Sequence, residues 1–239
     1  MSTRRRSDLI VTDYLKQIGS GHLQEGQLIP PESALCASYG VSRSVVREAM
    51  RALSAKGFLT ISQGAATQVA PKNKWHVLDP VFLEVNGGEE FFDQLQEARD
   101  VMEPRIAGLA AERATSAEIA EMWNVHHELV SIGESSADRH AELDIDFHRL
   151  IAAASRNAVL LSLQDSISSL GRRQRQAATH VPGAIDRAIF WHEQILRSLE
   201  QSDASGAEAA MGLHMRQVRE EIVQLDSSSM PVIAGAQEK

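Results

Sequence analysis

The chain has little cysteine and no long apolar run, and both shortages narrow the class of protein. One of its 239 residues is cysteine, Cys36, so an intramolecular disulfide framework is excluded and a reducing compartment is favoured. No stretch approaches the ~18 consecutive apolar residues of a membrane-spanning helix. The N-terminus "MSTRRRSDLI" is basic but lacks the apolar core of a secretory signal. We therefore expect a cytoplasmic protein with no membrane partner.

Familiar enzyme signatures are also missing. The sequence shows no Ser-His-Asp arrangement, no P-loop and no dinucleotide fingerprint. Hydrophobic residues make up 43% of the chain and charged residues 23%, which is ordinary for a globular protein and argues against disorder.

The net charge of −8 is unevenly distributed along the chain. Residues 1–74 contain ten Lys/Arg and five Asp/Glu, a balance of +5, and the remaining residues have a balance of −13. A basic N-terminal part on an acidic body indicates that only the N-terminal part meets a polyanion.

Turn residues and apolar periodicity divide the chain into two domains. Helical patterns over 8–18, 31–40 and 42–57 precede an alternating segment, 58–70, that is typical of a short hairpin around Gly64. This is the order of a winged helix-turn-helix. The later helical patterns cover 90–113, 116–132, 138–154, 157–177, 184–201 and 203–225. We predict a mainly α protein with a winged helix-turn-helix over 1–72, a linker over 73–84, an all-helical antiparallel bundle over 85–228 and a flexible tail over 229–239.

The third helix of the first domain separates an apolar face from a basic face. An arginine early on such a helix can bridge the O6 and N7 atoms of guanine in the major groove, and serines at its N-terminus can donate to phosphates. A solvated basic face is the alternative, but the winged arrangement and the basic balance favour DNA. The expected DNA contacts are Ser42, Arg43, Ser44, Arg47 and Arg51, with Gln63 and Gly64 at the wing tip.

The segment "EGQLIPPESALCASYGVSRSVVREAMRALSAKGFLTISQGAATQV" resembles the DNA-binding head of the GntR family. The resemblance implies DNA contact for Arg43, Arg47 and Gly64. Two positions depart from the family's pattern. Ser33 stands where the family often has arginine, which removes one expected contact, and Ala66 replaces the second glycine of the wing motif, so a differently shaped wing tip is expected.

Polar residues on the apolar stripes of the bundle are informative, because amphipathic helices normally keep them outside. Asp144 and His148, one helical turn apart, border the core, and His192 and His214 lie on the inward stripes of the last two helices. One inward histidine is usually a satisfied core residue. Three histidines with a carboxylate also suit a divalent metal, zinc above all, or nickel, manganese or iron. Both interpretations remain open at this point.

Arg99 shares the inward spacing of the apolar residues on its own helix. A buried guanidinium needs a partner, because an unpaired buried charge is expensive. The partner is either an acid such as Glu142 or Asp144, or a carboxylate ligand held in bidentate fashion. A carboxylate that also touched the metal would use both features.

Four stretches of the bundle, "EARDVMEPRIAGLAAERAT", "ELDIDFHRLIAAASRN", "HEQILRSLE" and "GLHMRQV", resemble the FCD ligand-binding domain of the FadR subfamily. The resemblance implies a metal held by Asp144, His148, His192 and His214. It also implies an effector site that includes Arg99 and Asn157. The stretches "APKNKWHVLDPVFLEV" and "ISSLGRRQRQA" are similar to regulators of sugar-acid catabolism of the galactonate operon repressor type.

Together these features predict a ligand-responsive transcription regulator and not an enzyme. We expect a homodimer that binds a pseudo-palindromic DNA operator, represses a sugar-acid or organic-acid catabolic operon, and changes its operator affinity when a small carboxylate binds. One alternative is a metalloenzyme with a DNA-binding appendage. A catalyst would also need a general base besides the metal ligands. Asp146 is near in the sequence but lies about 200° round the helix from Asp144 and faces away, which argues against an enzyme. The other alternative is a regulator that senses the metal itself.

Overall fold

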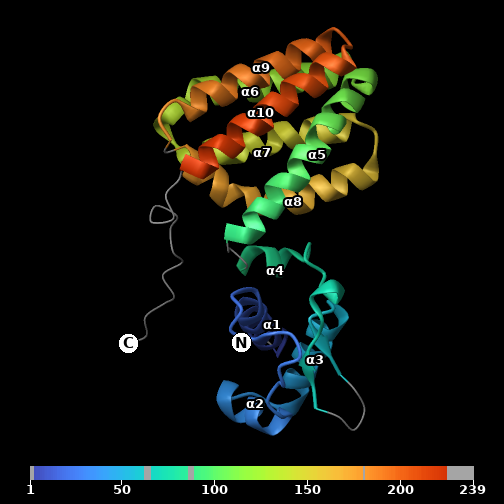
Figure 1. Cartoon of the computed structure of the whole chain (residues 1–239), viewed down its shortest axis with the longest axis vertical. Coiled ribbons are helices and arrows are strands. Elements are labelled where there is room, and N and C mark those ends of the chain that lie inside the picture. The colour runs from blue at the N-terminus through green and yellow to red at the C-terminus, as the bar shows by residue number, and fades with distance from the viewer. Residues whose placement is uncertain (1–2, 62–65, 86–88, 180, 225–239) are drawn as a thin grey trace. The chain divides into compact units, whose positions relative to one another are not determined.

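The computed structural model describes residues 3–61, 66–85, 89–179 and 181–224, which are mainly helical, as predicted (Figure 1). The chain divides into two compact units, residues 1–92 and 93–239, and each is described by itself. Within the described ranges, no helix is both long and apolar enough to cross a membrane.

The N-terminal unit is a winged helix-turn-helix. Its elements are α1 (Thr3–Gly19), α2 (Glu32–Tyr39), α3 (Arg43–Ala55), β1 (Leu59–Thr60), β2 (Gln68–Val69), the 3₁₀ turn η1 (Lys72–Lys74) and α4 (Pro80–Val85). The strands pair antiparallel with Leu59 opposite Val69. Gly40 ends α2 in the left-handed conformation, at φ +62°, as a C-terminal glycine commonly does. The expected wing-tip residues Gln63 and Gly64 lie outside the described residues.

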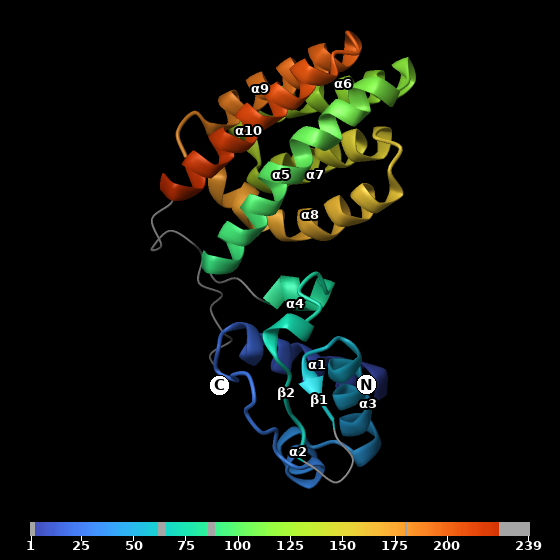
Figure 2. The ribbon, with the colours of Figure 1, turned by 45° about the vertical axis from the view of Figure 1, so that its right-hand side comes forward.

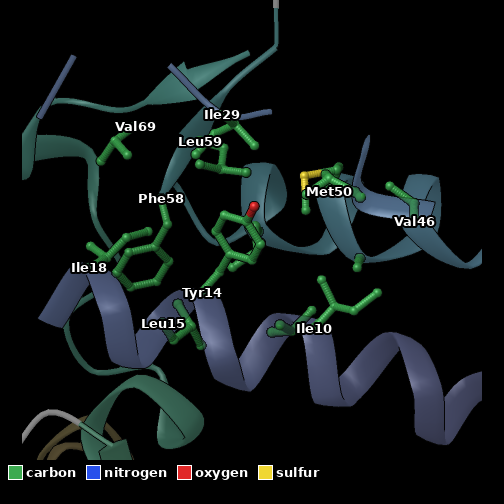
Figure 3. Close-up of a cluster of buried hydrophobic side chains, with 14 of the residues drawn as sticks. Ile10, Tyr14, Leu15, Ile18, Ile29, Val46, Met50, Phe58, Leu59 and Val69 are labelled. Carbon is green, nitrogen blue, oxygen red and sulfur yellow. The ribbon is translucent and has the colours of Figure 1, made fainter. Parts of the chain in front are cut away.

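The core of this unit lies between α1, α3 and the two strands. Figure 3 shows side chains of α1 pointing toward those of α3 and the wing. The buried side chains of this core include Ile10, Tyr14, Leu15, Ile18, Val46, Met50, Phe58, Leu59 and Val69. The apolar face of α3 expected from the sequence therefore packs inward, which leaves the opposite face of this helix exposed.

The segment expected to be a linker, 73–84, packs on the N-terminal unit. Phe82 is buried with its ring centroid 4.7 Å from that of Phe58, and the Trp75 ring lies 5.7 Å from Phe58. The Trp75 indole N–H donates to the carbonyl of Ala70 at 2.8 Å, and Lys56 pairs with Asp79. These contacts order the segment as η1, a turn and α4.

The C-terminal unit is a bundle of long helices (Figures 1 and 2). Its elements are α5 (Glu89–Arg113), α6 (Ser116–Ile132), the 3₁₀ turn η2 (Gly133–Ser135), α7 (Ala137–Ala154), α8 (Ala158–Ala178), α9 (Ala184–Glu200) and α10 (Ala204–Gln224). α9 lies beside α10 and α6, and α7 lies between α6 and α8. Thr115 and Glu118 form a capping box at the start of α6. Apolar side chains of α7 and α9, such as Phe147, Ile151 and Ile195, fill the core around the polar cluster described next.

Candidate metal centre

The four side chains predicted to hold a metal come together inside the bundle. α7 supplies Asp144 and His148 from successive turns, α9 supplies His192 and α10 supplies His214. All four are buried, and one ligand atom of each lies within 4.8 Å of the others. Residues more than sixty positions apart in the sequence therefore share one small volume.

The distances between these atoms suit a metal ion. The Nε2 atom of His214 lies 3.2 Å from Nε2 of His192 and 3.3 Å from Nε2 of His148. The Asp144 Oδ1 atom lies 3.4 Å from His192 Nε2 and 3.8 Å from His148 Nε2. A tetrahedral zinc ion with bonds of about 2.1 Å would place its ligand atoms about 3.4 Å apart. The donor set of three imidazoles and a carboxylate therefore fits zinc, and its chemistry also suits nickel, manganese or iron.

Two of the imidazoles have an oxygen atom beside their outer nitrogen, Nδ1. The His148 Nδ1 atom lies 2.5 Å from Oε2 of Glu103, a close electrostatic contact rather than an aligned hydrogen bond. The His214 Nδ1 atom lies 3.1 Å from the amide oxygen of Gln217. An oxygen beside Nδ1 favours the tautomer with its proton there, so the Nε2 lone pair faces the centre of the cluster.

Burial also keeps His192 and His214 of this centre neutral. Burial, together with the nearby His148, lowers the pKa of His214 to about 3. Burial and His214 lower the pKa of His192 well below its ordinary value. The His192 ring is stacked on Phe147 with centroids 4.2 Å apart, and its Nδ1 has no hydrogen-bond partner among the described residues. Neutral imidazoles with buried nitrogen atoms facing each other are ready to bind a cation at neutral pH.

Arg99 is buried beside this cluster, as its spacing predicted. Its Nε donates to Oε1 of Glu103 at 2.6 Å, and its Nη1 donates to Oε1 of Gln96 at 3.2 Å. The acid that pairs with it is therefore Glu103, not the suggested Glu142 or Asp144. Because Glu103 also contacts His148, one carboxylate connects the guanidinium to a ligand of the candidate metal centre. The spacing of Arg99 and Glu103, four residues on one helix, is the sequence signal that could have identified the pair.

A cavity of about 40 Å³ adjoins the cluster. Its polar lining consists of Arg99, His140, Asp144, Thr179, His214, Gln217 and Glu221. Of these, the sequence did not single out Thr179, Gln217 or Glu221. Asn157 is not among the described lining residues, because its side-chain oxygen caps α8 by accepting from the backbone N–H groups of Val159 and Leu160, each at 3.1 Å.

The predicted DNA-contacting residues of α3 lie on its exposed face. Arg43, Arg47 and Arg51 are exposed there, together with Ser42 and Ser44, whose hydroxyl oxygens are 2.9 Å apart. The Arg47 guanidinium is engaged by Glu32 of α2, with its Nε 2.9 Å and 3.0 Å from the two carboxylate oxygens. α2 and α3 therefore present one surface that is not uniformly basic.

Comparison with known proteins decides the family. Residues 10–69 match the bacterial regulatory proteins of the gntR family, and residues 94–217, more than half of the chain, match the FCD domain. The chain belongs to the GntR family of regulators with an FCD domain.

This GntR-family chain is similar over most of its length to curated regulators. It is 31% identical to the galactonate operon transcriptional repressor of Escherichia coli over 87% of this chain and 93% of that protein. It is 30% identical to the HTH-type transcriptional regulator LutR of Bacillus subtilis over 85% of this chain and 94% of that protein. A solved structure of a GntR protein from Streptococcus agalactiae shares the fold, with a TM-score of 0.51 and 24% identity over 90% of this chain and 99% of that chain.

These comparisons also settle the class of activity. The similar proteins are transcription regulators and not enzymes, which confirms the expectation of a regulator for this GntR-family chain. The buried cluster of Asp144 and three histidines belongs to the FCD domain, so its location is in the ligand-binding part of a regulator.

Proposed function

We propose that this chain is a homodimeric transcription repressor whose operator affinity falls when a small carboxylate binds at a metal centre in the FCD domain. The observation that carries the proposal is the convergence of four metal-ligand atoms in one buried cluster, beside a cavity that Asp144, His214 and the buried Arg99 line. A solvated ion pair does not account for three imidazole nitrogens that are buried and face one another.

The DNA part of the proposal rests on the exposed face of α3. Arg43 and Arg47 are one turn apart and early on the helix, where a guanidinium reaches guanine in the major groove. One such helix reads few base pairs, and two related by a twofold axis read a pseudo-palindrome with half-sites about one DNA turn apart. A homodimer is the arrangement that supplies this geometry.

The effector part rests on the chemistry of the cavity. Asp144, His148, His192 and His214 would hold the ion, which when bound supplies a Lewis-acidic position for one carboxylate oxygen. The Arg99 guanidinium would bind the carboxylate through its planar N–H groups. Glu103 holds Arg99 and contacts His148, so it fixes the orientation of both groups.

The small size of the cavity links binding to a change in the bundle. At about 40 Å³ the cavity holds on the order of three water molecules. A carboxylate of several carbon atoms therefore displaces side chains of α9 and α10 as it enters. A ligand shifts an equilibrium between two states only to the extent that it binds one of them more tightly. For the carboxylate to weaken operator binding, the expanded bundle that it favours must therefore be the state with weaker operator affinity.

The relatives favour a sugar acid or another small organic acid as the effector. Their printed names include a galactonate operon repressor, a Glc operon activator and a Uxu operon regulator, all from E. coli. We propose repression and not activation because the relative named as a repressor is 31% identical to this chain, whereas the Glc operon activator is 25% identical.

The test uses the purified full-length protein. Elemental analysis measures the metal per chain, and calorimetry measures binding of small carboxylates before and after chelation. Fluorescence anisotropy then measures affinity for a duplex selected from a random library. We expect one divalent ion per chain, a carboxylate that binds only before chelation, and an operator affinity that falls at least about fivefold on binding.

Arg99→Lys separates the guanidinium from its charge. It keeps a cation for Glu103 but loses the planar fork, so carboxylate affinity should fall about tenfold while the metal is retained. Arg105→Lys, an exposed change on the same helix, is the matched control. Carboxylates that bind equally well after chelation would rule out the metal-linked effector site.

A further inference from the structure

The cavity of the FCD domain has more polar groups than a carboxylate needs. The metal centre and Arg99 account for the carboxylate, which leaves Gln217 and Glu221 of α10 unused. They follow His214 by three and seven residues, so the three side chains share one stripe that extends about 10 Å along the helix axis. A ligand anchored near His214 therefore passes Gln217 as it extends toward Glu221.

Gln217 presents a buried donor with no acceptor among the described residues. The residue is 7% exposed, and its amide oxygen is used by His214. Its Nε2 atom is buried and has no hydrogen-bond partner among the described residues. An unsatisfied buried polar group costs about 1–3 kcal/mol, so an oxygen atom of a ligand beside this amide would be favoured.

Glu221 places a negative charge at the other end of the stripe. The residue is 3% exposed, and Arg187 donates to its Oε1 atom from Nε at 3.0 Å and from Nη2 at 2.7 Å. A carboxylate accepts hydrogen bonds and repels another carboxylate. The ligand group that meets Glu221 is therefore a hydrogen-bond donor and not a second carboxylate, and a hydroxyl is the simplest donor that a carboxylate ligand can carry.

His140 adds a third polar group to the lining from α7. Its Nε2 atom is buried without a hydrogen-bond partner among the described residues, and burial lowers the pKa of its ring. A neutral imidazole offers one donor and one acceptor, and a hydroxyl can satisfy either. Donor, acceptor and mixed groups thus surround one side of the cavity, the pattern that suits several hydroxyls in a row.

We propose that Gln217 and Glu221 form a hydroxyl-recognition subsite that makes polyhydroxy monocarboxylates better effectors than unsubstituted carboxylates. This inference rests on the proposed function, because the carboxylate must first be anchored at the metal centre and Arg99. A site built to pair with ligand hydroxyls rejects an analogue that lacks them, because its own buried groups are then left unpaired. Discrimination of tenfold or more is expected.

The experiment compares two acids of equal carbon number, D-galactonate and hexanoate. Calorimetry on the full-length, zinc-loaded protein gives the ratio of their affinities. Gln217→Glu keeps the oxygen that faces His214 and removes the amide donor, and Glu221→Leu removes the acceptor. The exposed neighbour Glu220 supplies the matched control, Glu220→Leu. Zinc content and thermal unfolding are measured for each variant. The ratio of the two affinities is compared, because the negative charge that Gln217→Glu adds should weaken the binding of both acids alike.

The wild type and the control should bind D-galactonate at least tenfold more tightly than hexanoate. In each subsite variant the ratio should approach one while hexanoate still binds. Equal affinities in the wild type, or a ratio that both subsite variants preserve, would overturn the subsite and leave the anchored carboxylate intact. Binding of neither acid to zinc-loaded wild type would instead overturn the proposed effector site itself.

Discussion

Replacing His192 by leucine should destabilise the metal-loaded protein and leave the metal-free protein as stable as the wild type or slightly more stable. His192 is fully buried, faces two other imidazoles and has an Nδ1 atom without a hydrogen-bond partner among the described residues. Leucine has a similar volume and can pack on Phe147, the ring on which His192 is stacked. The substitution therefore removes a metal ligand without leaving a large cavity.

The magnitude follows from linkage and burial. A metal present at a thousand times its Kd stabilises the folded state by about 4.1 kcal/mol. For a unit of this size, 1 kcal/mol shifts Tm by roughly 2–4 °C, so the metal-loaded variant should unfold roughly 8–16 °C below the wild type. After chelation the same change removes a buried group whose unpaired state costs about 1–3 kcal/mol. The chelated variant should then unfold at the same temperature as the wild type or a few degrees above it.

Thermal unfolding by circular dichroism, with zinc and with chelator, measures both differences, and elemental analysis should show that the variant loses the metal. His127→Leu, a change of the same type at an exposed position of α6, is the control. An equal loss of stability with zinc and with chelator would refute the reasoning. The histidine would then be part of a satisfied polar core.

Three further predictions concern the N-terminal unit. Arg47→Ala should weaken operator binding by about 1–3 kcal/mol in anisotropy titrations and leave Tm unchanged, since the side chain is exposed; unchanged operator affinity would disprove its role. Glu32→Gln should raise affinity for non-specific DNA a few-fold with a stability change under about 1 kcal/mol, because it removes a negative charge from an exposed pair; an unaltered salt dependence would count against this. Gly57→Ala should destabilise the unit by about 1–3 kcal/mol in denaturant, because Gly57 has φ +79° and a Cβ there would overlap the carbonyl of Lys74. Gly26→Ala has nearly the same φ, +78°, but open space around it, so a loss as large as that at Gly57 would exclude the overlap as the cause.

The sequence predicted those parts of the fold and site that depend on local periodicity. The four-residue spacing of the arginines on α3 and the inward positions of His192 and His214 follow from helix geometry alone. Once those helices pack around one core, inward polar side chains from different helices must meet. The four predicted metal ligands could therefore be identified before their distances were known.

The remaining features depend on contacts that periodicity does not encode. Glu103 follows Arg99 by one helical turn, and a sequence cannot distinguish such a buried pair from a solvated one. Gln217 and Glu221 lie beside His214 on its stripe, but their enclosure depends on α9, from which Arg187 reaches Glu221. The stretch 71–80 has a proline at each end, which favours a linker, whereas the order of the segment 73–84 comes from burial of Phe82 against Phe58.

The packing of that segment bears on how the DNA-binding part is isolated for study. A fragment that ended at residue 72 would lose the Trp75 and Phe82 rings and uncover Phe58, the aromatic centre of the core. Such a fragment would have an apolar patch in water and a tendency to self-associate, whatever its DNA-reading helix does. A fragment that continues through Val85 keeps α4 and is the better unit for binding and spectroscopic work on the head alone.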